Sequence, residues 1–139
     1  MKKVFALAFV ALSLMTSCSS DDSVSVTEEK LVKKWYFKSN QANGQTEVYE
    51  HLTCAKDYIE FLPDGNYSEY YVNECNPTSA STDTGNWDLE GNTVFISLLG
   101  DSFSGKVTEL SATKLQITIV ADYDDDGDTE NVKVNFTNN

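Results

Sequence analysis

The sequence predicts an all-β protein, a small antiparallel up-and-down barrel of eight to nine strands. Two observations support this prediction. Apolar and polar residues alternate along several short segments, as in strands with one face buried and the other in water. No window keeps apolar residues at the three- and four-residue spacing of an amphipathic helix over three turns. The expected strands are Lys34–Ser39, Thr46–Glu50, Asp57–Leu62, Tyr67–Val72, Gly85–Leu89, Thr93–Leu98, Phe103–Leu110, Leu115–Ala121 and Asn131–Thr137.

The segments between these strands have the composition of tight turns. In "LPDGN", Pro63 suits a type I turn and Gly65 suits the left-handed position that follows it. A three-residue loop of this kind pairs Phe61 with Tyr67. "LEGNT" and "LSATK" join further strands. Consecutive strands joined by tight turns form a meander, and closure of the meander into a barrel removes its exposed edges.

The N-terminal segment indicates export. Lys2 and Lys3 precede an apolar run from Val4 to Leu14, and small residues follow, as in a secretory signal. "LSLMTSC" resembles the lipobox of bacterial lipoproteins, which implies cleavage after residue 17 and lipidation of Cys18. The alternative is an ordinary secreted protein in which Cys18 has no role. We therefore expect a lipoprotein signal peptide over residues 1–17.

Residues 18–30 are expected to form a lipidated, flexible acidic tether, because "SSDDSVSVTEEK" is polar and has no apolar periodicity. "CSSDD" resembles the signals that direct lipoproteins of the Bacteroidetes group to the outer face of the outer membrane. This resemblance implies an outer-membrane lipoprotein exposed at the cell surface and attached to the membrane by its lipid. Residues 31–139 have the length of a single domain.

The charge of the chain excludes one class of partner. Asp and Glu number 22 against 10 basic residues, giving a net charge of −12, and none of the basic residues is arginine. An acidic surface repels phosphate backbones, and without arginine it lacks the planar fork that binds phosphates and bases in a bidentate way. We therefore expect no nucleic-acid binding.

Several motifs in order resemble the lipocalin-like domain common in Bacteroidetes lipoproteins. They are "LVKKW" from Leu31, "CAKDYIEFLPDGNY" from Cys54, "GNWDLEGNTVFIS" from Gly85 and "VTELSATKLQI" from Val107, with Cys75 between the second and third. Lys33 departs from the pattern, since many members have glycine before the first tryptophan. The resemblance implies a small antiparallel barrel. The members of this family mostly lack a defined ligand.

The sequence gives no indication of an enzyme. His51 is the only histidine, and neither a nucleophile elbow nor a glycine-rich phosphate loop is present. We therefore expect a protein without catalytic activity.

Cys54 and Cys75 are expected to form a disulfide, because an even pair of cysteines in an exported protein favours one. The alternatives are free thiols or a metal site at "HLTC", His51–Cys54, although no second pair completes four ligands. The three-residue loop after Leu62 leaves the two cysteines out of step by one position. An irregular segment near Asn73 and Glu74 is therefore expected to restore the match.

Tyr67, Glu69 and Tyr71 share one face of an expected strand and would bind a ligand if that face were the inner one. A buried carboxylate needs a partner, so the outward orientation with Glu69 in solvent is the simpler expectation. Trp35, Phe61 and Trp87 are expected to fill the interior, because an eight-stranded barrel is just wide enough for side chains to pack it. The list of expected ligand-binding residues is Tyr67, Glu69 and Tyr71.

The segment "DYDDDGDTE" near the C-terminus has the spacing of a calcium loop. It offers the carboxylates of Asp122, Asp124, Asp126 and Glu130 and the carbonyl of Asp128, with Gly127 at the sharp turn. The twelfth position is Lys133 in place of the bidentate glutamate of an EF-hand, and strands flank the loop. The alternative is an acidic hairpin loop that binds no ion. Calcium is the only cofactor that the sequence indicates.

These features predict a surface-anchored, lipocalin-like lipoprotein that binds an unidentified small molecule or partner without catalysis. The alternative is a structural or accessory module of an outer-membrane surface complex, with a solid barrel and a calcium-stabilised loop. A continuous cavity lined by aromatic side chains favours the first function, and a filled interior favours the second.

Overall fold

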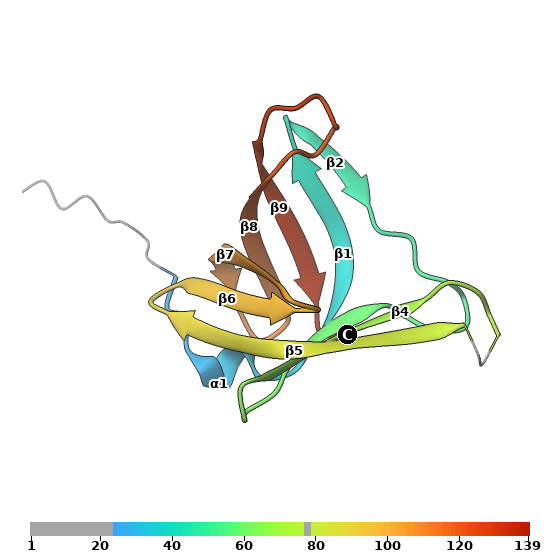
Figure 1. Ribbon diagram of the computed structural model, residues 1–139, viewed down its shortest axis with the longest axis horizontal. Coiled ribbons are helices and arrows are strands. Elements are labelled where there is room, and N and C mark those ends of the chain that lie inside the picture. The colour runs from blue at the N-terminus through green and yellow to red at the C-terminus, as the bar shows by residue number, and fades with distance from the viewer. Residues whose placement is uncertain (1–23, 77–78) are drawn as a thin grey trace, which may run out of the picture.

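The computed structural model describes residues 24–76 and 79–139, and these form a closed antiparallel barrel (Figure 1). Strands pair in the order β2-β1-β3-β4-β5-β6-β7-β8-β9, and β1 also pairs with β9. Eight strands therefore close the barrel, while β2 pairs only with the far half of β1, beyond the part that pairs with β3. The strands are β1 (Lys34–Ala42), β2 (Gln45–Val48), β3 (Tyr58–Phe61), β4 (Asn66–Val72), β5 (Ala80–Glu90), β6 (Thr93–Leu98), β7 (Asp101–Leu110), β8 (Lys114–Ala121) and β9 (Glu130–Thr137). The predicted all-β meander is confirmed.

Most expected strands match the observed ones to within a few residues, and β5 shows the largest difference. It begins at Ala80, five residues before the predicted start at Gly85. The added residues "ASTDT" are mostly exposed and have no apolar alternation. They are held in the sheet by β4, where Val72 pairs with Ala80.

A one-turn helix, α1 (Glu28–Leu31), precedes the barrel. Leu31 is fully buried, its carbonyl oxygen accepts a hydrogen bond of 2.8 Å from Nε1 of Trp35, and Val26 also packs against the core. Residues that precede the first strand thus pack against the core of the barrel. A single turn is too short to produce helical periodicity in the sequence.

The hairpin between β3 and β4 has the predicted three-residue loop. The backbone N–H of Leu62 donates to the carbonyl of Asn66 at 2.9 Å, and Phe61 pairs with Tyr67. Gly65 has a φ of +79°, a conformation that favours glycine. Pairing between β4 and β5 ends at Val72, and residues 73–76 are irregular, as the two cysteines require.

One end of the barrel is packed solid by aromatic and aliphatic side chains. The rings of Phe61 and Trp87 meet edge to face with centroids 5.0 Å apart, and Nε1 of Trp87 donates to the carbonyl of Leu62 at 2.9 Å. The prediction that Trp35, Phe61 and Trp87 fill the interior is confirmed for this end, which we call the packed end. Its other fully buried members are Leu31, Val107 and Leu115.

Across residues 24–76 and 79–139, no helix combines the length and the apolar character needed to cross a membrane.

Candidate ligand-binding site

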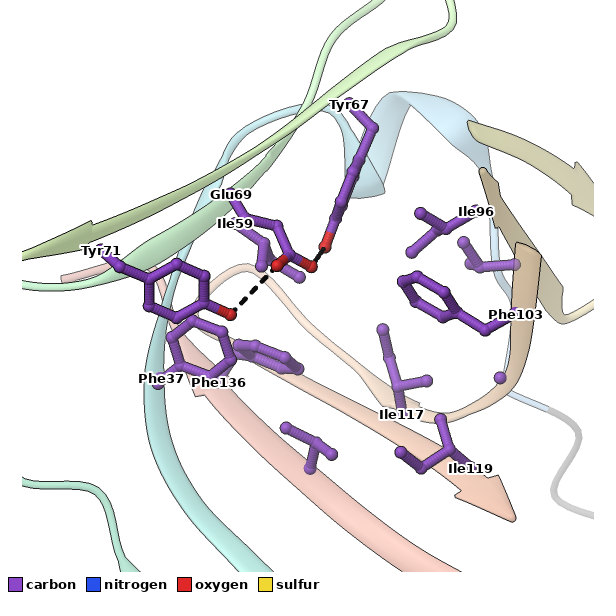
Figure 2. Close-up of a pocket in the computed structure, with 13 residues that line it drawn as sticks. Phe37, Ile59, Tyr67, Glu69, Tyr71, Ile96, Phe103, Ile117, Ile119 and Phe136 are labelled. Atoms are coloured by element: carbon purple, nitrogen blue, oxygen red, sulfur yellow. Dashed lines mark hydrogen bonds between the residues drawn. The ribbon is translucent and has the colours of Figure 1, made fainter. Parts of the chain in front are cut away.

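Beyond the packed end, the barrel interior contains a pocket of about 140 Å³ (Figure 2). Seven of the eight barrel strands contribute to its wall, and β5 is the exception. All but three of the lining residues are apolar. They are Phe37, Ile59, Tyr67, Glu69, Tyr71, Val94, Ile96, Phe103, Gly105, Ile117, Ile119, Val134 and Phe136.

Gly105 allows β7 and β8 to form one wall of the pocket. Phe103 and Gly105 of β7 point inward, as do Ile117 and Ile119 of β8, because alternate residues of a strand share a face. A Cβ atom at Gly105 would overlap Cγ2 of Ile117 and would lie 3.0 Å from Cγ2 of Ile119. Glycine therefore leaves room for these isoleucine side chains.

Phe103 marks the mouth of the pocket. It pairs with Ile96 across β6 and β7, and both side chains face the pocket (Figure 2). Ile96 is 5% exposed, whereas Phe103 is 44% exposed. An inward-facing aromatic ring therefore remains in contact with solvent at the open end of the barrel.

Glu69 is the polar centre of the pocket. The hydroxyl of Tyr67 donates to Oε1 of Glu69 at 2.6 Å, and the hydroxyl of Tyr71 donates to Oε2 at 3.1 Å (Figure 2). The expected outward orientation of Glu69 is wrong. Tyr67 is a core residue with 2% exposure, and because side chains alternate along β4, Glu69 and Tyr71 must also face inward.

Both tyrosine hydroxyls are held in their protonated form. Burial raises the pKa of Tyr67 far above its usual value of 10, and the nearby charge of Glu69 and its hydrogen bond raise it further. The pKa of Tyr71 is raised by the same causes, with burial the largest. Each phenol therefore acts as a hydrogen-bond donor to the carboxylate over the whole neutral range.

A stack of aromatic rings forms the side of the pocket next to β1. Phe37 stacks on Tyr49 at 5.0 Å and on Tyr71 at 5.7 Å between ring centroids. Tyr49 is fixed in turn by a hydrogen bond of 2.6 Å from its hydroxyl to Oδ2 of Asp57. Burial, followed by this bond to Asp57, raises the pKa of Tyr49 to about 12. Oδ1 of Asp57 accepts the backbone N–H of Val72 at 2.9 Å, so the buried Asp57 ties the stack to β4.

His51 belongs to this support and not to a metal site. Its Nδ1 accepts the backbone N–H of Asp57 at 3.1 Å, and its Nε2 lies 2.7 Å from the carbonyl oxygen of Phe37, to which it donates. Cys54 is joined to Cys75 in a disulfide with a Cα–Cα distance of 5.7 Å. The predicted disulfide is confirmed, and the alternative metal site at His51 and Cys54 is wrong.

The acidic loop joins β8 to β9, as predicted, and its carboxylates divide into two sets. Carboxylate oxygens of Asp122, Asp124 and Glu130 lie within 4.8 Å of one another. Asp126 is not a member of this cluster, and its Oδ1 accepts the backbone N–H of Asp128 at 2.8 Å. The structure thus brings together three of the five residues expected to bind calcium, and calcium binding itself stays a prediction.

The ligand-binding residues predicted from the sequence all belong to the β4 part of the pocket. The remaining walls carry an ordinary signal, the alternation of "TVFIS" and "KLQITIV", which predicts an inner face without telling whether that face is packed or hollow. The largest side chains that this signal does not single out are Phe103 and Phe136.

A closed meander of eight strands with an apolar interior pocket places the molecule among the small barrels that are able to enclose a ligand. Residues 31–117 match the family model of the lipocalin-like domain, and the chain belongs to this family.

Two solved structures share the fold. A lipocalin-like protein from Bacteroides uniformis superposes with a TM-score of 0.58 at 20% identity, covering 79% of this chain and 99% of the other. An uncharacterized protein from Bacteroides eggerthii superposes with a TM-score of 0.59 at 17% identity, and the match covers 78% of this chain and 99% of the other. No curated protein matches the chain significantly. At these identities the likeness supports the fold alone.

Proposed function

We propose that this protein binds a small, largely apolar molecule in its barrel pocket and catalyses no reaction on it. The observation that carries the proposal is the apolar interior space with the ring of Phe103 turned toward it and still 44% exposed. When a ligand covers an apolar surface that water reaches, the free energy of the system falls by about 25 cal/mol for each Å² of apolar surface removed from water. The fold family of the chain is consistent with such a role.

The size of the pocket limits the ligand. Its volume of about 140 Å³ is close to that of an engineered apolar cavity of about 150 Å³ in another protein, which binds benzene or xenon. The enclosed part of a ligand is therefore about as large as one aromatic ring. Longer groups would extend past Phe103 into solvent.

The lining residues supply no catalytic arrangement. The polar groups are one carboxylate and two phenols, and these hydrogen-bond to one another. Nucleophilic or acid–base catalysis requires a nucleophile beside a base, or a pair of groups with opposite proton affinities near the reacting atoms. The chemistry of the lining residues therefore supports a binding function.

The structural alternative lacks a supporting observation. Within residues 24–76 and 79–139 the interior is solid at the packed end alone, and the pocket beyond it is lined by aromatic side chains from four strands. These are Phe37, Tyr67, Tyr71, Phe103 and Phe136.

We also propose that the domain is held at the outer membrane, on the cell surface, through a lipid on Cys18. Residues 1–23 lie outside the described part of the chain, so this proposal rests on the lipobox-like "LSLMTSC" and on "CSSDD". Metabolic labelling with a radioactive fatty acid should label the protein, and Cys18→Ser should abolish the label. Equal labelling of the variant would contradict the proposal.

Toluene tests the binding function, because it is neutral and consists of one ring. Titration of ¹⁵N-labelled protein, followed by two-dimensional NMR, should shift amide signals of the lining residues of β6, β7, β8 and β9 and leave the packed end unchanged. Ile119→Phe should weaken toluene binding by about tenfold or more, because the larger ring occupies the pocket.

Val120→Phe is the matched control for this experiment. Val120 is the next residue of β8, faces outward and is 68% exposed. This variant should bind toluene as the wild type does. Absence of signal changes in the folded wild type, or equal binding by both variants, would contradict the proposed function.

A further inference from the structure

The pocket contains an acidic group without a basic counterpart. Glu69 is the one carboxylate among its lining residues, and no lysine or histidine of the described chain lines it. Carboxylates in apolar surroundings need hydrogen bonds or an opposite charge to offset the loss of water. The two tyrosine hydroxyls supply hydrogen bonds but leave the negative charge uncompensated.

The hydrogen-bonding capacity of Glu69 is only half used. An ionised carboxylate offers about four acceptor positions, and Tyr67 and Tyr71 occupy one on each oxygen. The remaining positions accept N–H or O–H donors. Since both phenol hydrogens are donated to Glu69, neither tyrosine offers its proton to an acceptor group of a ligand without losing a charge-assisted bond.

The charge of a ligand therefore matters. An anion in the pocket would lie beside Glu69 with no cation between them, and like charges in an environment of reduced dielectric constant repel strongly. An ammonium group would instead form a charge-assisted hydrogen bond with the carboxylate. The net charge of −12 adds a long-range attraction for cations.

The rest of the pocket fixes the apolar part of the ligand. Ile96, Phe103 and Ile117 lie across the pocket from Glu69 (Figure 2), and the volume of the pocket is that of about one aromatic ring. From these contacts we infer that the pocket binds small organic ammonium ions, amines whose apolar body is about the size of one aromatic ring, in preference to neutral or anionic molecules of the same shape. This inference deepens the proposed function and depends on it.

Three one-ring probes separate charge from shape: benzylamine, toluene and benzoate. In NMR titrations of the wild-type protein at pH 7 and low ionic strength, benzylamine should bind about tenfold more tightly than toluene. Benzoate should bind about tenfold more weakly than toluene. The inference would be overturned if benzylamine bound no more tightly than toluene, or if benzoate bound as tightly as benzylamine.

These outcomes also distinguish the inference from the proposed function. Toluene binding without a preference for benzylamine leaves the proposed function standing and refutes the choice of amines. No binding of either toluene or benzylamine refutes both.

Glu69→Gln tests the role of the carboxylate directly. The variant keeps the size of the side chain and removes its charge, so the preference for benzylamine over toluene should fall to about twofold or less while toluene still binds. Glu60→Gln is the control, because Glu60 is also a half-buried glutamate, on the neighbouring strand β3, and does not line the pocket. An unchanged preference in Glu69→Gln would overturn the inference, and should that variant fail to fold, the three wild-type titrations decide the matter alone.

Discussion

At the scale of single residues, Tyr67 determines which face of β4 meets the pocket. The sequence "NYSEYYV" places tyrosines on both faces, so its alternation does not reveal which face is buried. In the structure Tyr67 packs on Phe61 with centroids 5.4 Å apart, while Tyr70 stacks on Tyr58 at 5.0 Å on the other face. The sequence predicts that Tyr67, Glu69 and Tyr71 share one face of the strand. Whether that face points into the barrel depends on tertiary packing.

The tyrosines of the pocket should make the protein sensitive to alkali. Because the folded-state pKa values of Tyr67 and Tyr71 are raised above the usual 10, their contribution to stability is complete below about pH 10. It is lost as the pH rises toward the folded-state values, since unfolding then releases a proton. The free energy of unfolding, measured by urea denaturation, should therefore decline above about pH 10.

Phenylalanine variants isolate this effect. Tyr67→Phe and Tyr71→Phe should each show a shallower alkaline decline, and Tyr67→Phe should lose about 1–3 kcal/mol at pH 7 because a buried bond to a carboxylate is removed. Tyr70→Phe, on the outer face of β4, should keep the wild-type pH dependence. Identical alkaline slopes in all four proteins would show that the pocket phenols do not titrate as proposed.

At the scale of elements, the strands with clear alternation could be predicted from the sequence, and those without it could not. The predicted bounds of β6 match the observed ones, because Val94, Ile96 and Leu98 place an apolar residue at every second position. The polar first half of β5 and the single turn α1 were missed. Both are stabilised by contacts outside the element itself, pairing with β4 in one case and packing with Trp35 in the other, and neither contact leaves a periodic pattern within the segment.

The disulfide should stabilise the pocket wall beside β1. Cys54 and Cys75 close a loop of 21 positions, and on the chain-entropy model such a link contributes roughly 3 kcal/mol. Reduction, or the double variant Cys54→Ser with Cys75→Ser, should lower Tm. Amide hydrogen exchange should increase most near His51, Asp57 and Val72, which hold the aromatic stack.

The double serine variant also controls for the reductant. Its Tm should not change when dithiothreitol is added, whereas that of the wild type should fall. A wild-type Tm that is insensitive to complete reduction would show that the link contributes little to stability.

The acidic loop is predicted to bind calcium, and in the structure the candidate ligands whose carboxylates lie together are Asp122, Asp124 and Glu130. If they bind the ion, millimolar calcium should raise the free energy of unfolding after chelator treatment, by roughly 1.4 kcal/mol at a tenfold excess over Kd. Asp124→Asn should abolish this response, whereas Asp126→Asn should retain it, because the Asp126 carboxylate does not lie with the cluster of Asp122, Asp124 and Glu130. A thermal melt with no calcium response in the wild type would exclude the site.

At the scale of the whole molecule, the closed barrel could be predicted, but the pocket could not. Strand number, turn types and the absence of helical periodicity are local properties of the sequence. The hollow depends on how residues from seven strands meet, on Gly105 leaving space beside Ile117, and on Trp35, Phe61 and Trp87 gathering at the packed end. Composition alone does not tell whether apolar side chains fill a barrel or line it.

Xenon provides the most direct test of the central claim, that the open half of the barrel is an apolar binding site. Xenon occupies dry apolar cavities of about this size. In a crystal of the protein held under xenon gas, we predict a single strong electron-density peak among Ile96, Phe103 and Ile117. Density for side chains filling that space, with no xenon peak inside the barrel, would contradict the account.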